Sequence, residues 1–583
     1  MTDQRATELI ARQERLAAER GTIESHWQEI AEFVAPMRAE FTARRSAGEK
    51  RQQRIFDATP GMAAENLAAG LWGMVTNSAN EWFRIRARED RVNEDPAAQR
   101  WLEDVSRLMR QAFAAGGQRF YARAVDLYAD LVTFGTGVFY TEERPEGGVH
   151  FACRHLAECY IAENERDEVD TVYRRFEWTA RQAHRQWGER CSEAIRRMAE
   201  REPERKFTFL HVVKPRDDSG SAGGAGGGAR AGGRFDKSFE SFYVDVEGRT
   251  IVAEGGYYEF PYQVPRWSTR SRSAYGDSPA MLALPDIKML NAMAKTTIVA
   301  AQKAADPPIL APDEASVRGI RTAPGGIIYG GIDDNGRVRY QPLVTGANIG
   351  LTLEMADQRR QAVREAFHWS LLLMVAQPNQ TATEVLARQE EKLRLMGPHL
   401  GRIQSEFLDP LIDRLFGMMV RAGRVPPMPK SLADLPELKI DYVSPAARAQ
   451  RAGEGQAIVQ ALQALMPLGA IKPEVFETID TDAAARAIAE AFGAPASLLR
   501  PAEEIAAARE AKEQQAMMQQ LAGAAGPISG ALKNLAAAGK SGQDMLGGEG
   551  LAALLGSVAG GDTADAAANV SAGAGVGAVP AHG

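Results

Sequence analysis

Four side chains of metal-binding type lie close together in the sequence, at His150, Cys153, His155 and Cys159. Zinc-binding cysteines are typically about two to four residues apart, and a second ligand pair at a distance completes the site. The alternation of Phe151, Cys153 and His155 is instead typical of a half-buried strand. A structural role is therefore favoured, and a metal-dependent nuclease that uses this neighbourhood is kept as a lesser alternative.

Two further segments resemble parts of ligand sites. The glycine-rich segment 219–233 lacks the Lys-Ser/Thr pair of a phosphate-binding loop, so its composition predicts a disordered connection. Asp333, Asp334, Asn335 and Gly336 resemble the start of a calcium loop, but no glutamate follows at the required position. The Asn335-Gly336 pair instead predicts a tight hairpin turn with positive φ.

The usual motifs of hydrolases, zinc proteases and nucleotide-binding enzymes are absent from the sequence. Paired carboxylates such as Glu142-Glu143 and Glu390-Glu391 fit a solvated face. We therefore expect no catalytic residues, no metal site and no cofactor, and the protein is expected not to be an enzyme.

Composition narrows the class of protein further. At 583 residues, of which 45% are hydrophobic and 25% charged, the chain is long enough for about four ordinary globular units. Its 69 basic and 76 acidic residues give a net charge of −7, which argues against a tight general nucleic-acid binder. Three cysteines indicate a reducing compartment. The charged N-terminus and the short apolar run 369–376 predict neither secretion nor a membrane partner.

The elements that must position any functional residue begin with helices. Residues 3–35 predict two amphipathic helices with a break at Gly21-Thr22, followed by helices over 62–75, 97–114 and 119–134. Residues 136–267 predict short strands with one helix near 180–200, which makes this an α+β region. Segment 219–233 would join two of these strands.

A helix behind Asp277, Ser278 and Pro279 is predicted to run to about residue 304. One side of its helical wheel is polar and the other is small and apolar. The polar side is either an exposed face or a path for nucleic acid, and from the residues alone the exposed face is favoured. Another helix is expected at about 351–367. A long helix over 381–423 should bend at Gly397-Pro398 and Pro410 and keep one apolar stripe, formed by Met396, Leu400, Ile403, Phe407, Leu411 and Leu415.

Four segments together resemble the portal, or head-to-tail connector, proteins of short-tailed bacteriophages. They read IFDATPGMAAENLAAGLWGMVTNSANEWF (55–83), FPYQVPRWSTRSRSAYGDSPAMLALPDIKMLNAMAKTTIVAAQKAADPPILAPDE (260–314), TATEVLARQEEKLRLMGPHLGRIQSEFLDPLIDRLF (381–416) and DYVSPAARAQR (441–451). The resemblance covers about residues 1–455. The glycine-rich segment departs from it as an insertion.

The resemblance implies a predominantly α-helical α+β subunit that assembles as a dodecameric ring at one capsid vertex. Its regions would be a wing (1–270 and 381–425), two stem helices (271–304 and 347–370), a clip with a β hairpin (305–346), a channel loop (371–380), a crown (426–500) and a partly disordered Ala/Gly-rich tail (501–583).

The resemblance also gives roles to particular side chains. Channel-facing stem residues would be Lys288, Asn291, Lys295, Gln302 and Lys303. Channel-loop residues would be Leu371, Leu372, Leu373, Met374, Gln377, Asn379 and Gln380. Clip contacts for terminase or tail would be Arg318, Arg321, Arg337 and Arg339, and stem helices would pack at Ala294, Thr297 and Ala301.

The implied function is a conduit for genome packaging and ejection in the virion, assembled in the host cytoplasm. Implied partners are other copies of the chain, double-stranded DNA, the terminase large subunit, tail adaptor proteins, and the major capsid and scaffold proteins. The alternative from a different class is a helical capsid scaffold or head-tail adaptor without a DNA channel.

Overall fold

The computed structural model describes residues 3–517 except 44–45, 47, 94, 116–118, 145–146, 217–236, 311–326, 328, 330, 334, 344–348, 371–393, 434–437, 444–454, 466–479, 492–504, 506–507 and 513. Its internal contacts divide the chain into two units, Met1–Ala496 and Ser497–Gly583. The first unit is mixed α and β and mostly helical, as the sequence predicted.

The N-terminal residues form one helix, α1 (Gln4–Val34), so the predicted break at Gly21 is wrong. A glycine inside a helix costs only about 1 kcal/mol relative to alanine. The neighbouring Arg20 is buried and donates to the backbone oxygens of Leu156, Ala157 and Cys159 at 2.9, 3.0 and 2.6 Å. These contacts hold the helix straight through the glycine.

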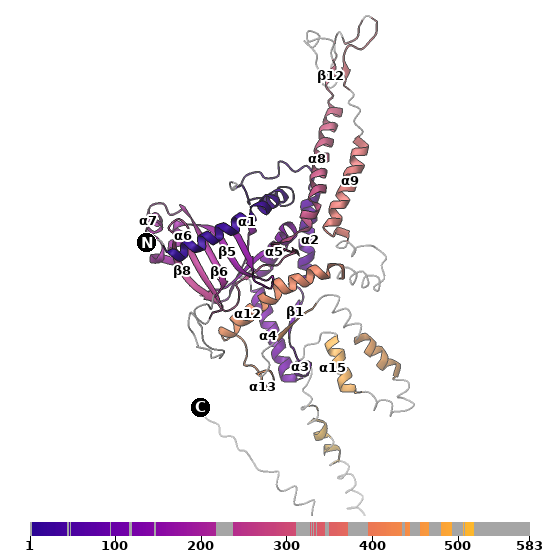
Figure 1. Ribbon diagram of the computed structural model, residues 1–583. Helices are drawn as coiled ribbons and strands as arrows, with labels where there is room; N and C mark the ends of the chain where they lie inside the picture. The colour runs from indigo at the N-terminus through magenta and orange to yellow at the C-terminus, as the bar shows by residue number, and fades with distance from the viewer. Residues whose placement is uncertain are drawn as a thin grey trace, which may run out of the picture. The chain divides into compact units, whose positions relative to one another are not determined.

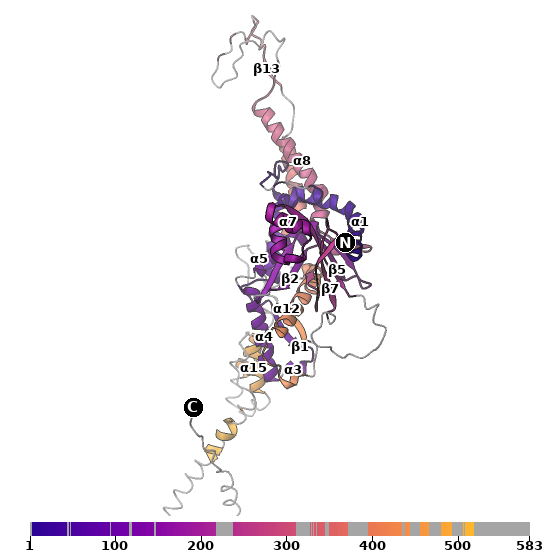
Figure 2. The same cartoon turned by 90° about the vertical axis from the view of Figure 1, so that its left-hand side faces the viewer.

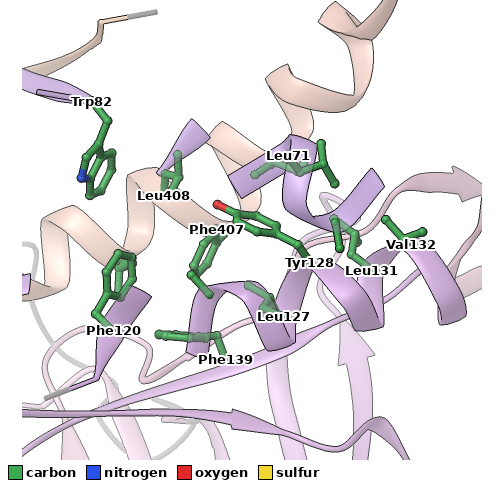
Figure 3. Packing of buried hydrophobic residues seen from close by; sticks show 14 of the residues in the cluster. Leu71, Trp82, Phe120, Leu127, Tyr128, Leu131, Val132, Phe139, Phe407 and Leu408 are labelled. Atoms are coloured by element: carbon green, nitrogen blue, oxygen red, sulfur yellow. The ribbon is translucent and has the colours of Figure 1, made fainter. Parts of the chain in front are cut away.

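A helical layer follows, formed by α2 (Thr59–Val75), α3 (Asp90–Asn93), α4 (Pro96–Ala114) and α5 (Phe120–Phe134). The three longer helices match the predicted ranges to within a few residues. Their apolar faces meet in a large core that also takes in Phe407 and Leu408 from far along the chain. Figure 3 shows Phe407 beside Tyr128 and Phe139, with ring centroids 6.2 and 5.2 Å away.

The strands form where alternating apolar residues predicted them. A three-stranded sheet has the order β3 (Val149–Arg154), β2 (Val138–Glu143), β9 (Tyr262–Gln263). A five-stranded antiparallel sheet runs β4 (Cys159–Glu163), β5 (Val169–Thr179), β6 (Lys206–Pro215), β7 (Phe239–Asp245), β8 (Thr250–Tyr257). β6 and β7 are paired neighbours, so segment 219–233 does join two strands, although it lies outside the described residues.

Helices cover both faces of the five-stranded sheet (Figures 1 and 2). Leu9 and Leu16 of α1 pack on one face, against Leu210 and Phe242. On the other face lie α6 (Ala180–Trp187) and α7 (Glu193–Arg201). The sequence predicted one helix here; the 3-10 turn Gly188–Arg190 divides it, and Gly188 has φ +56°.

Two long antiparallel helices, α8 (Pro279–Ala305) and α9 (Ile349–Ala366), lie side by side (Figure 1). The start of α8 is where the sequence placed it, because the Ser278 side chain accepts a hydrogen bond from the Met281 N–H at 3.0 Å. Before α8 come the short strands β10 (Ser268–Arg270) and β11 (Ser273–Asp277); between α8 and α9 lies the pair β12 (Ile309–Leu310) and β13 (Gln341–Pro342).

The predicted bent helix is continuous from residue 394 to Arg421 and contains a π-helical turn, Gln404–Leu408, before α12 (Asp409–Arg421). Pro410 has no N–H, and the Asp409 N–H donates to Gln404 O, five residues back. The predicted apolar stripe is confirmed. Met396, Ile403, Phe407, Leu411 and Leu415 are all buried, and Leu400 is half-buried.

One sheet was not foreseen from the sequence: β1 (Phe83–Ala87) pairs antiparallel with β14 (Leu438–Tyr442). Two further short helices precede and follow β14 in the sequence, α13 (Lys430–Ala433) and α15 (Thr481–Ala491). Among the described residues, every helix is too short or too polar to cross a bilayer.

Candidate functional site

Of the nineteen residues to which the sequence analysis gave a role, eight lie on α8, which packs against α9. Asp286 of α8 pairs with Arg359 of α9 at 2.8 Å, and both side chains are about one-third exposed. The small side of α8 faces inward at its lower end. Ala294 is buried within the subunit, Thr297 is half-buried and Ala301 is exposed. Ala294 therefore already packs inside its own chain, whereas Thr297 is partly open and Ala301 fully open to a neighbour.

The polar side of α8 contacts the chain's own N-terminal region. Lys288 Nζ pairs with Glu29 of α1 at 2.6 Å. The Asn291 side chain donates to Arg54 O at 2.9 Å and accepts from the Phe56 N–H at 2.7 Å. Lys295 Nζ lies 5.6 Å from the centre of the Phe56 ring. The remaining two residues of this group, Gln302 and Lys303, are exposed. Of the five predicted channel residues, three contact residues 29–56, although Lys288 and Lys295 remain exposed, and Gln302 and Lys303 lie beyond these contacts.

Asp57 joins this region to α2 and α9. Its carboxylate accepts from the Thr59 N–H at 2.9 Å and from Arg360 Nε at 2.8 Å. Burial alone would raise the pKa of Asp57, but the hydrogen bonds from Thr59 and Arg360 outweigh it and the pKa is lowered. Neither Asp57 nor Arg360 was singled out from the sequence. The only signal was that Asp57 precedes a Thr-Pro-Gly helix start, where a carboxylate commonly caps.

Exposed apolar side chains lie on the remaining sides of both helices. On α8, Leu282, Met289 and Val299 are 77%, 50% and 39% exposed. On α9, Leu351 and Met355 are 54% and 48% exposed. At 100° per residue, Leu282 and Met289 lie about 100–140° around α8 from Lys288 and Lys295, whereas Val299 lies beside these lysines. Leu282 and Met289 on α8, and Met355 on α9, are therefore apolar side chains that a single chain leaves largely exposed away from the contacts with residues 29–56.

The structure describes part of the segment between α8 and α9, which includes residues 331–333 and 335–343. The Gly336 N–H donates to Asp333 O at 3.0 Å, and Gly336 has φ +78°. The predicted hairpin turn is therefore present, with the positive φ at Gly336 and not at Asn335. Arg337 and Arg339 are exposed beside it, whereas Arg318 and Arg321 lie outside the described residues.

The predicted channel loop, residues 371–380, lies outside the described residues, together with the seven side chains singled out within it. His368 and His399, which lie on either side of segment 371–393 in the sequence, are near each other and near Trp267. His399 stacks on Trp267 with ring centroids 4.1 Å apart, and its Nδ1 donates to Trp267 O at 3.0 Å. His368 lies 6.2 Å from both rings. Burial and the neighbouring His399 lower the pKa of His368.

The His/Cys neighbourhood is part of a buried network. Cys153 Sγ lies 3.6 Å from Asp130 Oδ2, and Asp130 pairs with Arg38. His155 Nδ1 accepts from the Ala157 N–H at 3.0 Å, so its Nε2 donates to Arg38 O. Burial and the Asp130 charge raise the pKa of the Cys153 thiol well above its usual value. Within the described part of the chain, no three His, Cys, Asp or Glu side chains are placed to hold a metal.

Comparison with known proteins gives a consistent result. The family model "Bacteriophage head to tail connecting protein" matches residues 6–499. The "Probable portal protein" of Bordetella phage BPP-1 is 33% identical over 88% of this chain and 92% of its own length. The "Portal protein" of Salmonella phage epsilon15 is 29% identical over 89% of this chain and 93% of its own length. A chain of the solved structure "Neck of empty GTA particle computed with C6 symmetry" is 12% identical, with a TM-score of 0.36, over 71% of this chain and 91% of that chain.

Proposed function

The chain belongs to the bacteriophage head-to-tail connecting protein family, and on that premise we propose that twelve copies close into a ring through which the genome enters and leaves the capsid. The resemblance expected from the sequence is confirmed. The protein is a structural, non-enzymatic portal component of the virion at the head-tail junction. In the proposed ring, α8 and α9 are the stem, residues 305–346 the clip, 371–380 the channel loop and 426–500 the crown.

The two exposed apolar surfaces of the helix pair are the observation that carries this proposal. A ring needs a head-to-tail interface, in which one patch of a subunit meets a different patch of the next. Leu282 and Met289 offer one patch on α8, and the exposed Met355 lies in another on α9. Met289 and Met355 lie at a similar height, because Asp286 pairs with Arg359 between antiparallel helices.

The negative net charge favours the passage of DNA through the ring over tight binding of DNA to it. Twelve chains of net charge −7 carry a total of about −84, so most of the ring repels a phosphate backbone and few contacts hold it. Lys288, Lys295 and Lys303 are all exposed, but Lys288 pairs with Glu29 and Lys295 lies over the Phe56 ring, so their charge is partly engaged within the subunit. We assign terminase and tail adaptors to the clip around Arg337 and Arg339, and capsid and scaffold proteins to the wing.

The interface is tested by placing a charge on one patch. We expect the wild-type chain of 63.3 kDa to assemble into a particle of about 760 kDa, and Met289→Glu to reduce ring formation by at least tenfold. A carboxylate at a dry helix contact has no partner and costs several kcal/mol. Mass photometry and negative-stain images are the measurement. Gln302→Glu, which adds the same charge on another exposed side of α8, is the matched control.

The outcomes separate the alternatives. Rings with a central hole that form in wild type and Gln302→Glu but not in Met289→Glu support both the function and the interface. If all three chains form rings, the interface between subunits does not include Met289. Wild-type particles without a hole would favour the scaffold or adaptor alternative.

A further inference from the structure

Residues 54–57, here called the strap, cross the helix pair beside Asn291, near the middle of α8. The side chain of Asn291 holds this strap by its backbone alone, because its amide nitrogen donates to Arg54 O at 2.9 Å and its amide oxygen accepts from the Phe56 N–H at 2.7 Å. An asparagine amide offers both a donor and an acceptor on one short side chain. This two-sided contact fixes the strap's position along α8.

Charged groups hold the strap from both sides. Lys288 Nζ pairs with Glu29 at 2.6 Å, and Arg54 pairs with Glu32 at 3.6 Å, so α8 and the strap are each tied to α1. Lys295 Nζ lies 5.6 Å from the Phe56 ring centre, within range of a cation–π contact. The exposed pairs contribute little individually. Together they restrict the strap to one path between α1 and α8.

The far end of the strap is anchored more firmly. The Asp57 side chain is 7% exposed and joins the first turn of α2, through the Thr59 N–H, to Arg360 of α9. Four helices, α1, α2, α8 and α9, are therefore linked by four consecutive residues. Beyond this level, α8 continues with exposed residues at 298 and 299 and from 301 to its end at Ala305.

We propose that residues 54–57 are a clamp that sets the tilt of the helix pair on the body of the subunit, with Asn291 as its central positioning residue. α8 has 27 residues and is about 40 Å long. Fourteen of these residues, about 21 Å of helix, lie beyond Asn291, so a small rotation at the strap moves the far end of α8 by a few ångströms. The inference concerns a single chain and holds whether or not the chains close into a ring.

The clamp is tested on the full chain by hydrogen exchange and by an intramolecular distance. In Asn291→Ala we expect the amide of Phe56 to exchange about tenfold faster, the factor set by the loss of one hydrogen bond. Asn291→Asp keeps the acceptor for Phe56 and loses the donor to Arg54, so its effect should be smaller. Thr296→Ala is the matched control, since Thr296 Oγ1 bonds only to Ala292 O of its own helix.

Tilt is measured with spin labels at Gln186→Cys on α6 and Gln302→Cys on α8, both exposed positions. The background is Cys153→Ser, because Cys159 and Cys191 are buried, and unlabelled chain is added to dilute contacts between copies. We expect a narrow distance distribution in the wild type and in Thr296→Ala, and a broad one in Asn291→Ala.

Two results would overturn the clamp: an equally narrow distribution and unchanged Phe56 exchange in Asn291→Ala, or equal broadening in Thr296→Ala. If Asn291→Ala fails to fold, the same comparison is made with Asn291→Asp. A chain that forms no ring but shows the broadening would reject the ring and leave the clamp standing.

Discussion

At the scale of single residues, the interior between the two larger sheets depends on a neutral histidine. His211 is 1% exposed, contacts the Tyr262 hydroxyl at 2.7 Å and Ser241 Oγ at 3.0 Å, and stacks on Tyr243 with centroids 4.1 Å apart. Burial, together with the positive charges of Arg174 and Arg154, lowers the pKa of His211 well below its usual value. The folded state therefore excludes a proton that the unfolded state accepts.

This predicts an acid-sensitive contribution to stability. Below the ordinary histidine pKa of about 6.5 the unfolded state binds the proton and the folded state does not, so the free energy of unfolding falls as the pH falls. The loss is at most about 1.4 kcal/mol per pH unit. We expect His211→Gln to be less stable than wild type at pH 7.5 but to lose less stability between pH 6.5 and 5. Urea unfolding at several pH values measures both, with exposed His184→Gln as control. Equal pH slopes in all three chains would contradict it.

Residue types alone do not distinguish these buried roles from exposed ones. The polar spacing of Lys288, Asn291 and Lys295 was visible in the sequence, but a polar helix face looks the same whether it meets water, DNA or another segment of the chain. Its partners, Glu29, Arg54 and Phe56, lie more than two hundred residues earlier. Cys153 lies in β3 as the alternation predicted, because alternation is a local signal, whereas His155 follows the end of β3 and caps the next 3-10 turn.

At the scale of elements, two glycines differ in whether the surrounding structure has room for a side chain. Gly21 lies in mid-helix with open space around it, and no atom would lie within 4 Å of an added Cβ. Gly276 lies where two backbone segments cross, and an added Cβ would be 2.4 Å from Gly135 O. The Gly276 N–H also donates to Thr136 Oγ1 at 2.8 Å, which keeps the two segments close.

We therefore predict that Gly21→Ala stabilises the protein by about 0.5–1 kcal/mol through helix propensity. We predict that Gly276→Ala destabilises it by about 2 kcal/mol or more, because backbone must move to relieve the clash. Chemical unfolding of the two variants beside wild type measures the difference. Destabilisation by Gly21→Ala would mean that α1 requires its glycine, contrary to the continuous helix described above.

Elements set by local pattern were predictable, and elements set by distant partners were not. The strands from β2 to β8 follow alternating apolar runs, and α8 begins at its Ser278 cap. By contrast, β1 is stabilised by β14, which comes from far along the chain, and the Tyr442 hydroxyl bonds Asp409. In the π-helical turn before Pro410, Glu406 pairs with the buried Arg266 at 2.9 Å, a partner 140 residues earlier that the local sequence does not indicate.

At the scale of the whole molecule, two independent boundaries fall at the same place. The internal contacts of the chain divide between Ala496 and Ser497, and the family match ends at residue 499. Residues 501–583 contain no Phe, Tyr or Trp. A segment without aromatic side chains lacks the residues that bury the most area in a core.

We predict that a chain of residues 1–499 keeps the stability of the full chain to within about 0.5 kcal/mol and forms the same ring. The shorter chain of residues 1–436 should be much less stable, because it lacks β14 and leaves Phe83 and Ile85 of β1 without their paired strand. Unfolding and particle mass are measured together on both chains. If the 1–499 chain folds but remains monomeric, residues 500–583 are needed for assembly; if it fails to fold, the boundary at Ala496 does not mark an independent unit. Only the 1–436 chain tests whether the returning strand closes the core, since it removes that strand as well as the segment beyond the boundary.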